Sequence, residues 1–162
     1  MGKKYIYSGD GHGKTPTALG MAVWMACRGK SVVIIQFLKG KGQEESEFMR
    51  RLEPEIKLFC FEKTDENFAL LSQEQRQEEA GNIRNGLNFA KKVLTTGECD
   101  LLILDEVLGL IDNHIITVEE LKNLLEAGAD TDMDIVMTGI MLNDEVCRLA
   151  DEVTKMEKIC VK

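Results

Sequence analysis

An early glycine-rich stretch has the residue types of a phosphate-binding loop. It runs from Ser8 to Thr15, reads SGDGHGKT, and lies between a short apolar run and a helical pattern that begins near Lys14. Glycines at alternate positions let the backbone turn tightly, so that successive N–H groups point into one concavity. The helix N-terminus adds the positive end of its dipole, and Lys14 adds a full charge. The stretch therefore predicts a polyphosphate site.

The spacing is close to the P-loop pattern G-x-x-x-x-G-K-[ST], except that Ser8 occupies the position of the first glycine. A dinucleotide fingerprint fits less well, because the spacing is not G-x-G-x-x-G and the second strand ends in Gln36-Phe37 rather than an acid. A plain glycine-rich turn is the remaining alternative. The P-loop interpretation gives a cradle made of Ser8, Gly9, Asp10, Gly11, His12, Gly13, Lys14 and Thr15.

Two residues modify this cradle. Pro16 removes a backbone N–H directly after Lys14-Thr15. Proline is tolerated in a first helical turn, so we expect the helix to form while the cradle loses one amide. His12 is either a hydrogen-bond donor to phosphate or a solvated loop side chain.

An acidic pair complements the loop. The apolar run Leu101–Leu104 ends in Asp105 and Glu106, as a Walker B strand does. Mg²⁺ takes oxygen ligands, usually one or two protein groups with phosphate oxygens and water. We therefore predict a magnesium site from Thr15, Asp105 and Glu106, with Glu106 alternatively the base of a hydrolase. The simpler alternative is an acidic pair that caps the next segment.

The elements around these motifs alternate between strands and helices. This alternation predicts an α/β fold in three layers, α/β/α, with a mainly parallel sheet. A basic loop, Lys39-Gly40-Lys41-Gly42, follows the second strand, where open α/β sheets bind ligands, although a solvated turn is equally consistent. The expected strands are 4–7, 31–37, 56–61, 101–104, 134–138 and 153–156; the expected helices are 14–28, 44–51, 72–97, 117–125 and 143–150; and 64–71 is an expected loop.

Composition limits the class of protein. A chain of 162 residues, 44% hydrophobic and 30% charged, predicts one globular domain over residues 1–162. A net charge of −8 disfavours nucleic-acid binding, and we expect no membrane span or signal peptide, hence a cytoplasmic protein. The chain contains an odd number of widely spread cysteines: Cys27, Cys60, Cys99, Cys147 and Cys160. We therefore expect mostly buried, reduced thiols, without a disulfide framework or a cysteine metal site.

Five blocks together resemble the ATP:corrinoid adenosyltransferases, the cob(I)alamin adenosyltransferase family of the P-loop type. The block Gln36 to Gly40, Q-F-x-K-G, is the most specific, because generic P-loop proteins lack it. The blocks occur in the family's order over nearly the whole chain, at residues 7–15, 32–40, 102–106, 136–139 and 149–156.

The resemblance implies a RecA-like P-loop NTPase fold, a homodimer, and transfer of the 5′-deoxyadenosyl group of ATP to reduced cobalt with release of triphosphate. It implies ATP, Mg²⁺ and a corrinoid as ligands, and a possible reductase partner that supplies cobalt(I). Cobalt(I) carries no proton, so no general base is needed. Lys14 and Glu106 are then the catalytic candidates, and Gln36 and Lys39 join the loop in ligand binding.

The chain also departs from the family pattern. His12 stands where lysine is common, Pro16 where a second threonine is common, and Ile140 where arginine is usual. Residues 64–68 contain no Phe-x-Trp, and we expect Trp24 to lie in the core. Two other functions stay open: an ATPase or phosphotransferase acting at the γ-phosphate, with Asp105 or Glu106 orienting the nucleophile, and a catalytically silent ATP-binding module.

Overall fold

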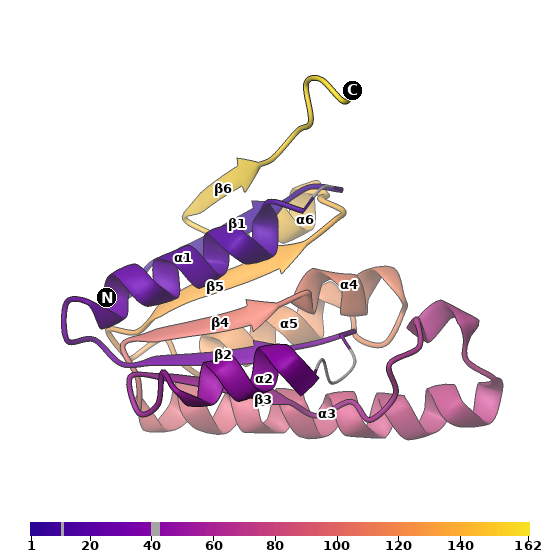
Figure 1. Ribbon diagram of the computed structural model, residues 1–162, viewed down its shortest axis with the longest axis horizontal. Helices are drawn as coiled ribbons and strands as arrows, with labels where there is room; N and C mark the ends of the chain where they lie inside the picture. The colour runs from indigo at the N-terminus through magenta and orange to yellow at the C-terminus, as the bar shows by residue number, and fades with distance from the viewer. Residues whose placement is uncertain (11, 40–42) are drawn as a thin grey trace.

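A parallel sheet forms the centre of the protein. The computed structural model describes residues 1–10, 12–39 and 43–162. Within these residues six strands pair, always in parallel, in the order β3-β2-β4-β5-β1-β6 (Figure 1). The inner strands β2 and β4 each begin with four apolar residues and are buried along their whole length, as expected where both faces are covered. The strands are β1 Lys4–Ser8, β2 Val32–Gln36, β3 Ile56–Cys60, β4 Leu101–Asp105, β5 Asp134–Gly139 and β6 Glu152–Lys155.

Helices cover both faces of this sheet, which confirms the predicted α/β/α layers (Figure 1). Ile34 and Ile103 face α1 and α2, whereas Ile35 and Leu104 face the core formed with α3 to α6. Successive side chains of a strand point to opposite faces, so each inner strand supplies both cores. The helices are α1 Lys14–Ala26, α2 Gln43–Arg50, α3 Gln73–Thr96, α4 Val107–Asp112, α5 Val118–Glu126 and α6 Asp144–Cys147, with a 3₁₀ turn, η1, at Phe68–Leu70.

Two helices begin at capping boxes that the sequence predicts. The Ser72 hydroxyl accepts the N–H of Gln75, whose side chain accepts the N–H of Ser72, and Thr117 with Glu120 does the same at α5. Each box satisfies two N–H groups that the helix itself leaves unpaired. Gly97 ends α3 at a φ of 62°, which glycine adopts without strain.

Some local structure differs from expectation. The sequence did not predict α4, because six residues are too few to show helical periodicity. The helix expected at 143–150 is limited to α6, and the loop expected at 64–71 contains η1. Within the described residues, no helix has both the length and the apolar character needed to cross a membrane.

The expectation that Trp24 lies in the core is wrong, since Trp24 is 56% exposed. Helix α1 buries Ala18 and Ala22, which are one turn apart. Trp24 follows Ala22 by two positions and so lies on the opposite side of the helix. The Arg28 guanidinium stacks over its ring, with Cζ 3.3 Å from the centroid.

The expectation that most cysteines are buried is also wrong. Cys99 is buried, Cys60 and Cys147 are half-buried, and Cys27 and Cys160 are exposed. All five belong to the described residues, and none of them forms a disulfide. Burial raises the pKa of the Cys99 thiol to about 12, so this thiol stays protonated at neutral pH.

The strand order brings three chain segments to one edge of the sheet. β5 lies between β4 and β1, and all three strands run in the same direction. Ligands of open α/β sheets bind beyond the carboxyl ends of such strands. The loop after β1, the acidic pair after β4 and the end of β5 therefore meet there.

Candidate functional site

The glycine-rich loop connects β1 to α1. Gly9 has a φ of 149°, and its N–H donates to the carbonyl oxygen of Gly139 at 3.2 Å. A Cβ at Gly9 would collide with the carbonyl oxygen of Met156, so this position requires glycine. Gly13 caps α1, where its carbonyl accepts the N–H and the hydroxyl of Thr17 at 3.0 and 2.7 Å. The open helix N-terminus thus faces the same edge of the sheet as the acidic pair.

Pro16 lies in the first turn of α1 and does not interrupt the helix. A proline in this turn loses an N–H that no helix carbonyl could have accepted. This agrees with the expectation that the helix forms despite the proline.

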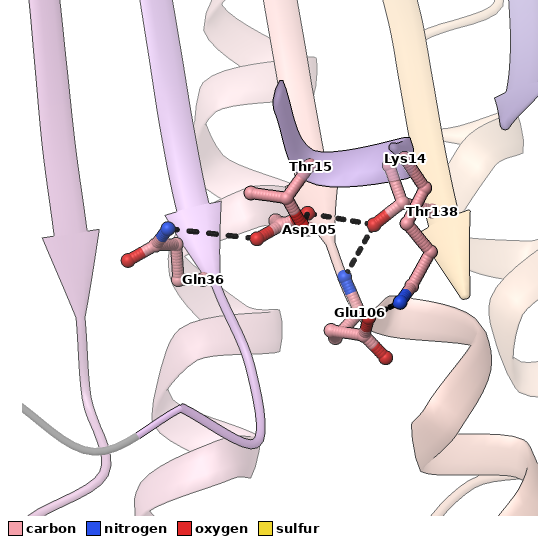
Figure 2. Close-up of polar contacts among 6 residues, drawn as sticks. All are labelled: Lys14, Thr15, Gln36, Asp105, Glu106 and Thr138. Carbon is pink, nitrogen blue, oxygen red and sulfur yellow. Dashed lines mark hydrogen bonds and ion pairs between the residues drawn. The ribbon is translucent and has the colours of Figure 1, made fainter. Parts of the chain in front are cut away.

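Asp105 ends β4 and is the centre of a polar network (Figure 2). Its carboxylate accepts the hydroxyl of Thr15 at 3.0 Å and the hydroxyl of Thr138 at 2.7 Å. Gln36 Nε2 donates to the other carboxylate oxygen over a long 3.5 Å. Asp105 is only 2% exposed, so these donors replace the water that a buried carboxylate needs.

Glu106 follows at a φ of 60°, in the left-handed region that non-glycine residues rarely adopt. Its N–H donates to Thr138 Oγ1 at 2.8 Å, and its carboxylate pairs with Lys14 Nζ at 2.8 Å (Figure 2). The two side chains are 12% and 20% exposed. The lysine of the glycine-rich loop is therefore held by the second residue of the acidic pair.

Thr138 is the residue that the sequence analysis missed. Its hydroxyl donates to Asp105 and accepts the N–H of Glu106, so it fixes both acids at once. A polar residue at the end of an apolar strand was the available signal. Its proximity to Asp105 follows only from the strand order, which places β5 directly beside β4.

Other predicted site residues lie less centrally. Asp10 and His12 are exposed, and Gly11 lies outside the described residues. Ser8 is fully buried, and its hydroxyl has no hydrogen-bond partner within the described part of the chain. Its side chain is therefore inaccessible to a phosphate, and only its backbone could take part. The basic loop is described only as far as Lys39.

A cavity of about 710 Å³ lies next to the acidic pair. It extends from Thr15 and Asp105 to a rim of carboxylates, amides and exposed apolar side chains. Its other lining residues are Leu38, Lys39, Asp65, Glu66, Asn67, Phe68, Glu106, Gly109, Asp112, Asn113, Ile140 and Met141. Lys39 thus borders the same cavity as the acidic pair, and its role in ligand binding stays a prediction.

A buried glutamate holds one wall of this cavity. Leu38 has a φ of 55°, and its N–H donates to Glu62 Oε1 at 2.8 Å. The Leu38 side chain packs where a Cβ on Gly109 would lie, beside Glu106. Burial raises the pKa of Glu62, the nearby charge of Glu79 raises it further, and the Leu38 N–H partly opposes this. The sequence contains no pattern that singles out Glu62.

The donor set beside the loop suits magnesium. Thr15 offers a hydroxyl and Asp105 a carboxylate, and their oxygens lie 3.0 Å apart. Within the described residues, no group of three or more His, Cys, Asp or Glu side chains could hold a metal alone. A magnesium ion bound here would therefore complete its shell with phosphate oxygens and water, as it commonly does. Glu106 is turned toward Lys14 rather than toward Thr15.

Solved structures share this fold. A KaiC-like protein of Pyrococcus horikoshii superposes with a TM-score of 0.60 at 16% identity, covering 98% of this chain and 74% of that protein. The flagellar accessory protein FlaH of Methanocaldococcus jannaschii gives a TM-score of 0.63 at 17% identity, covering 98% and 72%. The predicted RecA-like P-loop fold is confirmed.

Sequence relatives are more specific. The corrinoid adenosyltransferase of Escherichia coli K12 is 25% identical over 154 residues, covering 95% of this chain and 76% of the relative. The enzyme of Pseudomonas aeruginosa, also 25% identical, gives 95% and 74%, and CobA of Salmonella typhimurium, 26% identical, gives 95% and 76%. The model of the family ATP:corrinoid adenosyltransferase BtuR/CobO/CobP matches residues 1–161. Because that model covers nearly the whole chain, this chain belongs to the ATP:corrinoid adenosyltransferase family.

Proposed function

We propose that this protein transfers the 5′-deoxyadenosyl group of ATP to the reduced cobalt of a corrinoid and releases triphosphate. The observation that carries the proposal is the contact between the two halves of the nucleotide site. Thr15 from the loop bonds Asp105, and Lys14 pairs with Glu106, directly beside a cavity of about 710 Å³.

The residues present match the demands of this reaction. A cobalt(I) nucleophile carries no proton, so attack on the ribose C5′ needs no general base. The protein must instead orient ATP and stabilise the charge that gathers on the departing triphosphate. Lys14 would exchange Glu106 for a phosphate oxygen, and the N-terminus of α1 would face the same charge. Mg²⁺ held by Thr15 and Asp105 would neutralise part of that charge.

The open part of the cavity is suited to the second substrate. Its rim presents the carboxylates of Asp65, Glu66 and Asp112 and the amides of Asn67 and Asn113. Corrin rings carry amide side chains, which hydrogen-bond to such groups. Ile140 and Met141 offer apolar contact at the same mouth. Family resemblance further suggests a cytoplasmic homodimer supplied with cobalt(I) by a reductase.

The product of the reaction tests this proposal. Purified protein is given MgATP and chemically reduced cobalamin, and the products are read by absorbance of the cobalt–carbon bond and by chromatography of the nucleotide products. We expect triphosphate and adenosylcobalamin in equal amounts. A parallel reaction without the reductant should form neither. Unchanged ATP would instead support a silent ATP-binding module.

A second candidate function is ATP hydrolysis or transfer at the γ-phosphate. Glu106 favours it, because a carboxylate beside the phosphate-binding lysine could orient water. ADP with phosphate as the only products would support this alternative. Glu106→Gln should then stop ADP formation, whereas an adenosyltransferase with this substitution would still release triphosphate.

A further inference from the structure

The residue that follows β6 lies against the phosphate loop. β6 pairs in parallel with β1, with Lys155 opposite Ser8. The pairing continues for one residue, because the N–H of Met156 donates to the carbonyl oxygen of Ser8 at 2.7 Å. Met156 therefore stands beside Gly9, where β1 ends and the loop begins.

Met156 contacts both ends of that loop. Its carbonyl oxygen occupies the space that a Cβ on Gly9 would need. At the other end, a Cβ on Gly13 would lie 3.0 Å from Met156 Sδ, and the hydroxyl of Thr17 lies 3.9 Å from the same sulfur. The side chain thus lies between the loop and the first turn of α1, although Thr17 precedes Met156 by 139 positions in sequence. An unbranched thioether is well suited to an irregular gap of this kind.

The strand that delivers Met156 contributes little to the core. β6 is an edge strand whose neighbour in the sheet is β1 (Figure 1). All four of its residues are exposed. Met156, in contrast, is half-buried. The C-terminal segment therefore gains its burial where it meets the phosphate loop.

We propose that Met156 is a positioning residue that holds the two ends of the phosphate loop, at Gly9 and Gly13, in place for triphosphate binding. The proposal rests on the proposed function only for the choice of ligand. A glycine-rich loop has many accessible backbone conformations, and a ligand that must select one of them binds more weakly. The main chain of Met156 restricts this freedom at Gly9, and its thioether restricts it at Gly13, before the ligand arrives.

Binding of inorganic triphosphate with Mg²⁺, measured by calorimetry on the full chain, tests the proposal. Met156→Ala should weaken the affinity by about fivefold, because the loop loses its packing partner. Met156→Leu keeps most of the volume and should stay within about twofold of the parent affinity. With ATP as substrate, Met156→Ala should raise KM by a similar factor and leave kcat at saturating ATP nearly unchanged.

Val153→Ala is the matched control, because Val153 lies in the same strand, is 37% exposed and pairs with Ile6 of β1, before the loop begins. It should bind triphosphate like the parent. Hydrogen exchange of the Thr17 amide, which donates to the Gly13 carbonyl at 3.0 Å, gives a second readout and should accelerate in Met156→Ala but not in Val153→Ala.

Equal triphosphate affinity in the parent and Met156→Ala would overturn the proposal, and so would a Met156→Leu variant as weak as Met156→Ala. The binding assay requires no adenosyl transfer. A protein that binds triphosphate in a Met156-dependent way but forms no adenosylcobalamin would therefore refute the proposed function and leave this inference standing.

Discussion

The two halves of the cavity are built differently. On the side of β1, β4 and β5, the polar side chains are largely buried and bonded to one another, from Lys14 and Glu106 to Thr138 and Asp105. On the opposite side, the lining comes from loops, the 3₁₀ turn η1 and α4, and Ile140 and Met141 are 50% and 63% exposed. One half is organised before any ligand binds, and the other presents open side chains.

This difference matches the two ligands that we propose. A triphosphate concentrates charge on a few oxygens, and binding it requires donors fixed at defined positions. A corrin ring is broad and is held by many weak contacts, which loops can provide. Substitutions on the bonded side should therefore reduce ATP use strongly, and substitutions on the open side should act mildly and on the corrinoid alone.

The largest effect should come from Lys14→Ala. Without the ammonium group, both binding and departure of the triphosphate lose their main positive charge, and we expect kcat/KM for ATP to fall at least about a hundredfold. Steady-state kinetics with varied ATP measures this loss. Lys122→Ala is the control, because Lys122 is exposed and pairs only at 3.7 Å with Glu119. Retention of parent activity by Lys14→Ala would show that the bonded half does not hold the nucleotide.

Thr138→Val should have the next largest effect. The substitution keeps the shape but removes the hydroxyl that bonds Asp105 and the Glu106 N–H. Loss of such an orienting partner should lower kcat/KM about tenfold. The unpaired buried N–H should also cost about 1–3 kcal/mol of the free energy of unfolding. Thr138→Ser should restore both quantities, and a serine variant as impaired as valine would contradict the role of the hydroxyl.

A smaller effect is expected from Ile140→Ala on the open side. Removing apolar contact at the cavity mouth should raise KM for the corrinoid about three- to tenfold. The affinity for ATP, measured by calorimetry, should not change. Ile159→Ala serves as the control, since Ile159 is 98% exposed and belongs to the C-terminal segment. A loss of ATP affinity in Ile140→Ala would remove the distinction between the two halves.

The smallest expected effect concerns Glu62, which supports the open side through Leu38. Burial raises the folded-state pKa of Glu62, so the folded protein keeps a proton that the unfolded chain has already released. The free energy of unfolding should therefore fall as the pH rises from the ordinary glutamate pKa of about 4.3 to the raised pKa of Glu62. Above that pKa, the contribution of Glu62 should stay constant.

Glu62→Gln isolates that contribution, because a glutamine is neutral and still accepts the Leu38 N–H. Urea unfolding between pH 4 and pH 8 measures the free energy of unfolding of both proteins. Within the stated pH window, Glu62→Gln should become increasingly more stable than the parent as the pH rises. Glu98→Gln is a comparison at an exposed acid. Parallel pH profiles for Glu62→Gln and the parent would argue against the raised pKa.

The same contrast appears in what could be foreseen from the sequence. The sequence predicts the phosphate loop, the Asp105-Glu106 pair and both capping boxes, because each depends on residues that are close together in the chain. Trp24 was misplaced because a helical segment with apolar residues on several sides does not reveal which side faces the sheet. Helix α4 was too short to produce a period.

Local spacing alone thus determined the alternation of strands and helices, the loop that turns around Gly9 and the acids that end β4. Tertiary structure decided which distant residues complete the site. Thr138 reaches Asp105 because β5 lies between β4 and β1, and Met156 reaches Gly13 because β6 pairs with β1. Such contacts follow from the order of strands in a sheet. That order depends on how whole layers pack, so the spacing of neighbouring residues does not reveal it.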